Sequence, residues 1–188
     1  MPKAAGTSLN SALSLHDVFH PVRNQPALAR HFINALGRDV FESYYSFGFV
    51  RNPWDVAVSW FHYRLINPDQ GGHKEAEAAG SFQNYAARVL TQPDADKKVG
   101  LQHPFLVDDA GALAVSFVGR YELLAPDFAA ETERLAVSTI GLDHFNQSYH
   151  APWPGLCSRT TSEIVGALVA QDAALFGYST DPADYGIR

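Results

Sequence analysis

The sequence predicts an α/β protein in which helices cover a central parallel sheet, built as a single domain over residues 1–188. Two observations support this fold class. Residues 47–51 are almost continuously apolar, which is typical of a short parallel strand that is covered on both faces. Directly after Pro53 the apolar residues recur at the helical period as far as Leu65, so a helix that packs one face on the sheet follows this strand.

The elements of the first half follow from their start and stop signals. A helix is predicted over residues 9–15, and a second one begins with Pro26 at a first helical position and stops at Gly37. Residues 38–45 are interpreted as a connection. Residues 67–80 have the composition of a long loop, and Ser81 then caps the next helix.

The second half begins with two short apolar runs, 105–107 and 113–118, which a turn separates, and they predict strand, turn and strand. Gln102 and His103, just before them, are polar groups that could face an acceptor. Helices are predicted over residues 126–137 and 160–176. The later helix begins with a capping box and stops at a glycine.

Composition bounds the class of protein. The chain is 46% hydrophobic and 18% charged, which is ordinary for a globular domain with a core. Its formal charge of -6 argues against a nucleic-acid or anionic-membrane partner, because both require a broad basic face. The only cysteine, Cys157, is interpreted as a small apolar side chain that is buried or half-buried. No apolar run approaches a membrane span, and we expect a cytoplasmic protein; the sequence leaves its oligomeric state open.

The first eight residues carry the clearest candidate site. Small residues, with Gly6 and the hydroxyls of Thr7 and Ser8, precede the helix predicted over 9–15, so backbone N–H groups can converge on one anion. Lys3 adds a positive charge. The pattern is not a Walker A loop, because this lysine precedes the glycine instead of following it. A frayed N-terminus ahead of an N-capped helix is the alternative interpretation.

A second candidate anion site lies where the strand over 47–51 meets the helix after Pro53. Arg51 ends the strand, and Ser59 falls two turns along the helix. A phosphate there would gain the guanidinium, the N–H groups of the first helical turn and the serine hydroxyl. The alternatives are a surface salt bridge for Arg51 and a serine bonded to its own helix backbone for Ser59.

Taken together, these motifs resemble the sulfotransferases that use 3′-phosphoadenosine-5′-phosphosulfate (PAPS) as donor. Residues 2–8 look like the 5′-phosphosulfate loop of this family, and Arg51 with Ser59 looks like its 3′-phosphate motif. Residues 117–122 are similar to the strand and Tyr-Glu pair that border the adenine pocket. Residues 172–178 look like the members that act on carbohydrates, including bacterial relatives. The resemblance runs through nearly the whole chain.

The resemblance implies a fold, a donor and a set of site residues. The fold would be a three-layer, P-loop-like domain with a central parallel sheet. Because the family has a buried strand directly before the loop and only Met1 precedes it here, we expect the first strand to be missing from this chain. Lys3 would stabilise the charge that develops on the departing nucleotide, no metal would be needed, and the acceptor would be a small molecule or glycan. The other donor-binding residues implied are Ala5, Gly6, Thr7, Ser8, Arg51, Ser59 and Tyr121.

The general base of the acceptor hydroxyl is harder to assign. The family takes a histidine or glutamate from the region after the first helix, and His20 is our candidate, with His16 and Glu42 behind it. His16 and His20 also have the spacing of two metal ligands on a helix, but Pro21 and the lack of a third ligand disfavour zinc.

Two other functions stay open. A small P-loop nucleotide kinase would depend on ATP and magnesium, which the missing Walker lysine and the lack of an obvious magnesium-binding acid disfavour. A nucleotide-binding remnant without catalysis would fit the missing strand and the uncertain base.

Overall fold

The computed structural model of the chain describes residues 3, 4, 9, 28–136 and 151–187. The chain divides into two compact units, each made of two segments. Unit 1 comprises Met1–Arg51 and Gln102–Gln147, and unit 2 comprises Asn52–Leu101 and Ser148–Arg188. The architecture is mixed α/β, as the sequence predicts, and the expectation of a single domain stays a prediction.

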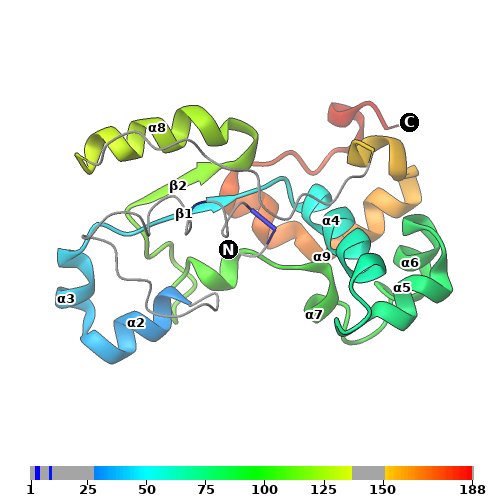
Figure 1. Cartoon of the computed structure of the whole chain (residues 1–188), viewed down its shortest axis with the longest axis horizontal. Helices are drawn as coiled ribbons and strands as arrows, with labels where there is room; N and C mark the ends of the chain where they lie inside the picture. The colour runs from blue at the N-terminus through cyan, green and yellow to red at the C-terminus, as the bar shows by residue number, and fades with distance from the viewer. Residues whose placement is uncertain (1–2, 5–8, 10–27, 137–150, 188) are drawn as a thin grey trace. The chain divides into compact units, whose positions relative to one another are not determined.

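Unit 1 holds the pair of strands found in the described ranges. Strand β1 (Phe47–Val50) lies beside β2 (Phe117–Arg120), and the two pair in parallel (Figure 1). The strand predicted at 47–51 is confirmed, whereas the one predicted at 113–118 begins later. Between the two apolar runs predicted as strands, only one antiparallel bridge forms in the described residues, and it joins Val107 to Leu113.

Glycine at position 119 allows the close packing of the two strands. A Cβ there would lie 2.4 Å from Cε1 of Phe49 on the neighbouring strand. Phe49 is 1% exposed and packs with Leu9 and Phe128. Any larger residue at 119 would therefore displace a buried aromatic ring.

The rest of the described secondary structure of unit 1 is helical. Helix α8 runs beside β2 (Figure 1), and a smaller apolar cluster joins α2 to α3 through Ala29, Ile33 and Phe41. The helical elements described in this unit are α2 (Ala29–Leu36), α3 (Arg38–Ser43), η1 (His103–Phe105), η2 (Tyr121–Leu123) and α8 (Leu124–Arg134).

The structure corrects two predictions at the start of unit 1. Helix α2 begins at Ala29, three residues later than predicted, because Leu28 is its extended N-cap residue. The prediction of a connection over 38–45 was wrong. Gly37, with φ 85°, ends α2 and lets the chain start α3 at once, and Phe41 anchors this helix by burial.

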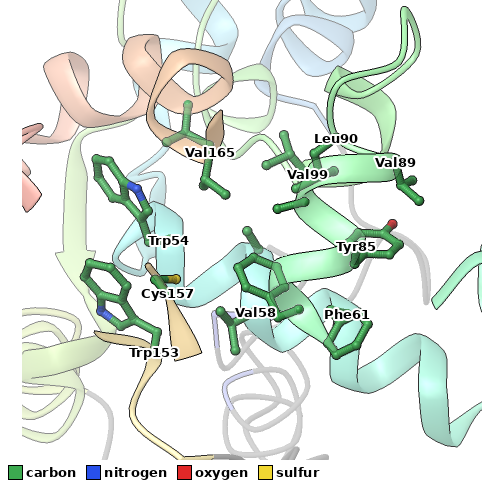
Figure 2. Packing of buried hydrophobic residues seen from close by; sticks show 14 of the residues in the cluster. Trp54, Val58, Phe61, Tyr85, Val89, Leu90, Val99, Trp153, Cys157 and Val165 are labelled. Carbon is green, nitrogen blue, oxygen red and sulfur yellow. The ribbon is translucent and has the colours of Figure 1, made fainter. Parts of the chain in front are cut away.

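The secondary-structure elements described in unit 2 are all helical, and they enclose a large apolar core. In Figure 2 the rings of Trp54 and Trp153 lie together beside Cys157. The two rings stack with centroids 5.9 Å apart, and Nε1 of Trp54 donates to the carbonyl of Ser162 at 2.9 Å. The elements are α4 (Pro53–Ile66), α5 (His73–Ala79), α6 (Phe82–Arg88), α7 (Asp96–Val99), η3 (Trp153–Leu156), α9 (Arg159–Phe176) and η4 (Pro182–Tyr185).

Cys157 is buried in this core, as expected of a small apolar side chain. Burial, and secondarily the charge of Asp55, raises the pKa of its thiol to about 12. The thiol is therefore protonated at neutral pH and is not a nucleophile.

Most predictions for the helices of unit 2 are confirmed, but the start of α9 and the loop over 67–80 are corrected. The caps at Ser81 and Gly177 are confirmed, whereas α9 begins at Arg159 with Ser158 as its N-cap instead of a capping box at Thr160. The loop predicted over 67–80 contains α5, because a run of alanine and glutamate between two left-handed glycines favours a helix. Among the described residues, none of the helices is both long and apolar enough to cross a membrane.

Candidate functional site

The candidate site lies in unit 1, where β1 and β2 end. Because the strands are parallel and Val50 is opposite Arg120, the residues that follow them, Arg51 and Tyr121, leave the sheet at the same edge. The guanidinium carbon of Arg51 lies 4.4 Å from the centroid of the Tyr121 ring, which is a cation–π contact. The carboxyl ends of parallel strands are where open α/β sheets bind ligands.

Lys3 is brought to the same place. Nη1 of Arg51 donates to the backbone carbonyl of Lys3 at 3.3 Å, and Lys3 takes the left-handed conformation with φ 61°. A non-glycine residue in this region is strained unless its surroundings hold it there. The next residue, Ala4, is completely buried, so the backbone after Lys3 is anchored in unit 1.

The charge of Lys3 is affected by its surroundings. Burial, and secondarily the positive charge of Arg51, lowers the pKa of Lys3 from 10.5 to about 8. Both causes disfavour the charged amine, and an anion bound next to this amine would favour the charged form instead. The electrostatics therefore suit the recognition of a negatively charged group.

The backbone of Arg51 is held by the buried side chain of Gln102. Its Oε1 accepts from the Arg51 N–H at 2.9 Å, and its Nε2 donates to the Arg51 carbonyl at 2.8 Å. Gln102 is 1% exposed. The expectation that Gln102 faces an acceptor was wrong, because its amide is used on the protein backbone.

Tyr121 is positioned by the junction of β2 with α8. The backbone N–H of Arg120 donates to Oδ2 of Asp127, a residue in the first turn of α8, at 2.8 Å. Tyr121 itself is half-buried and begins η2. The backbone just before the Tyr121 ring is therefore held to the start of α8.

Of the other predicted donor-binding residues, Ser59 is the one that the structure describes. Ser59 is completely buried in α4 of unit 2. Its role in binding a 3′-phosphate stays a prediction. Ala5, Gly6, Thr7, Ser8 and His20 lie outside the described residues, and so does His16. Their roles also stay predictions.

Glu42, the reserve candidate for the base, is exposed on α3 and forms an ion pair with Arg38 at 3.3 Å between Nη1 and Oε1. Within the described ranges no three His, Cys, Asp or Glu side chains gather as metal ligands would. The described part of the chain thus offers two cations and an aromatic ring, which together can recognise an anion attached to a flat, aromatic group.

Comparison of the chain with models of known protein families, with curated proteins and with solved structures gives no match.

Proposed function

We propose that this protein is a sulfotransferase that moves the sulfuryl group of PAPS to a hydroxyl or amine of an acceptor, with a carbohydrate as the favoured acceptor class. The observation that carries the proposal is the meeting of Lys3 and Arg51. These residues come from the two motifs that resemble the two phosphate sites of the family, and the guanidinium of one contacts the backbone of the other. A three-layer, P-loop-like fold belongs to the same proposal.

The residues of unit 1 fit such a donor. PAPS carries negative charge at its 5′ and 3′ ends and a flat base, and the site offers one cation for each end. The guanidinium of Arg51 can form the paired, charge-assisted hydrogen bonds that phosphate favours. Arg51 covers one face of Tyr121, so an adenine stacked on this ring would use the opposite face.

Lys3 would act on the oxygen that bridges the sulfuryl group and the 5′-phosphate. When this bond breaks, negative charge develops on that oxygen, and a preorganised amine stabilises it. The negative charge of the bound donor would keep the amine in the charged form that this stabilisation requires. The roles of the Thr7, Ser8 and Ser59 hydroxyls, and of His20 as base, rest on the sequence and the resemblance.

Binding is the first test of this proposal. By calorimetry, adenosine 3′,5′-bisphosphate should bind at least about tenfold more tightly than ATP with magnesium, a difference of about 1.4 kcal/mol. Arg51→Ala should weaken binding of the bisphosphate about 10- to 100-fold, because it removes a charged hydrogen-bond donor. Arg88→Ala, which removes an exposed arginine of unit 2, is the matched control and should change nothing. Preference for ATP with magnesium would favour a nucleotide kinase instead.

Catalysis needs a separate assay. Purified protein with radiolabelled PAPS and a panel of saccharides should transfer the label to one of them. A chain that binds the bisphosphate tightly and transfers no sulfate to saccharides, phenols, alcohols, amines or water would instead be a nucleotide-binding protein without this activity.

A further inference from the structure

The amide of Gln102 contacts both backbone hydrogen-bonding groups of Arg51, and no sequence motif pointed to this contact. The strand pairing recorded for β1 and β2 ends at Val50 and Arg120, one residue before Arg51. Beyond that point the side chain of Gln102 binds the N–H and the carbonyl of Arg51 at 2.9 and 2.8 Å. A side chain thus does for Arg51 what a neighbouring strand does for a residue inside a sheet.

The two hydrogen bonds of the planar Gln102 amide, one accepted and one donated, fix the backbone conformation of Arg51. The N–H and C=O of one residue point to the same side only when its backbone is extended, so Gln102 holds Arg51 in the conformation of a strand. The next residue, Asn52, is already the N-cap of α4, because its side chain accepts from the N–H groups of Trp54 and Asp55. The chain changes from strand to helix within these two residues.

The direction of the Arg51 side chain depends on the conformation of its own backbone. From its extended backbone, Arg51 reaches across the Tyr121 ring at 4.4 Å and to the Lys3 carbonyl at 3.3 Å. If the Arg51 backbone left this extended conformation, its Cβ and guanidinium would turn toward another side of the chain. Gln102 is 1% exposed, so water cannot readily replace its amide when it is removed.

We infer that Gln102 is a positioning residue that aims the guanidinium of Arg51 and so sets the preference of this site for a nucleotide with a 3′-phosphate. This inference rests on the proposed function, because it assigns the 3′-phosphate to Arg51. Gln102 acts through Arg51 and does not itself touch the ligand.

The test compares two nucleotides and two variants. Calorimetry gives the affinities of adenosine 3′,5′-bisphosphate and adenosine 5′-monophosphate, whose ratio measures the contribution of the 3′-phosphate. Gln102→Met keeps the length of the side chain but cannot form the two hydrogen bonds. Ile33→Val trims the α2–α3 cluster of unit 1 and controls for a general loss of stability.

In the wild-type protein the bisphosphate should bind at least about tenfold more tightly than the monophosphate. Gln102→Met should bring this ratio to within about twofold of that of Arg51→Ala, with the affinity for the monophosphate unchanged. Ile33→Val should keep the wild-type ratio. A Gln102→Met protein that keeps the wild-type ratio would overturn the inference and leave the proposed function standing.

A wild-type protein with no preference for the bisphosphate would overturn the proposed function instead. In that case the exchange rate of the Arg51 amide, measured by NMR without ligand, tests whether Gln102 fixes the Arg51 backbone. The Arg51 amide should be protected in the wild-type protein and exchange at least about tenfold faster in Gln102→Met, while amides of α8 keep their rates. Equal exchange of the Arg51 amide in both proteins would overturn the positioning role.

Discussion

The lowered pKa of Lys3 predicts how nucleotide binding depends on pH. With a pKa of about 8 in the free protein, Lys3 is about 90% charged at pH 7 and about 10% charged at pH 9. A bound anion favours the charged amine and raises this pKa, so binding above pH 8 requires the uptake of a proton. The affinity for adenosine 3′,5′-bisphosphate should therefore fall about tenfold between pH 7 and pH 9.

Calorimetry at pH 7, 8 and 9 measures this effect, because the phosphates of the ligand are almost fully ionised across the range. Two buffers with different heats of ionisation would show the proton uptake directly. Lys3→Ala should bind more weakly at pH 7 and show a flat profile, whereas Lys74→Ala, an exposed lysine of α5, should behave as the wild type. An affinity that is constant from pH 7 to pH 9 in the wild-type protein would refute the assignment of Lys3 to the anion site.

Two further predictions concern turnover and stability. Lys3→Ala should lower the rate of sulfate transfer about 100- to 1000-fold, the usual loss for one preorganised donor, while Lys74→Ala keeps its rate; an unchanged rate in folded Lys3→Ala protein would remove Lys3 from the mechanism. Asn52→Ala should lower the free energy of unfolding by about 1 kcal/mol in urea titrations, because the first turn of α4 loses its cap, and Asn52→Asp should restore most of it. Equal stability of the two Asn52 variants would show that the cap contributes nothing.

Local signals explain what the sequence predicts well. The strand at 47–51 and the helix after Pro53 are found where expected, because an apolar run, a proline and a helical period each act over a few neighbouring residues. The prediction of a loop over 67–80 missed helix α5, and the reason is also local. Its glycines were interpreted as loop formers, although Gly72 and Gly80 lie at the two ends of α5.

The candidate site was only partly predictable. The sequence pointed to Lys3, Arg51 and Tyr121 separately. The meeting of Arg51 with Tyr121 depends on the pairing of β1 with β2, and no local pattern encodes which strands pair. The contact of Gln102 is harder still to foresee. Its partners are backbone atoms, which every residue has, so the sequence contains no complementary residue type that would point to Arg51.

The division of both units into two separate segments has a consequence for folding during synthesis. Trp54 lies in the first segment of unit 2, and the carbonyl that its indole binds belongs to Ser162 in α9, near the other end of the chain. While the ribosome is still making residues 102–147, the apolar faces of α4 and α6 have no α9 to cover them. Nascent chains of this protein should therefore need protection from aggregation until α9 has been synthesised.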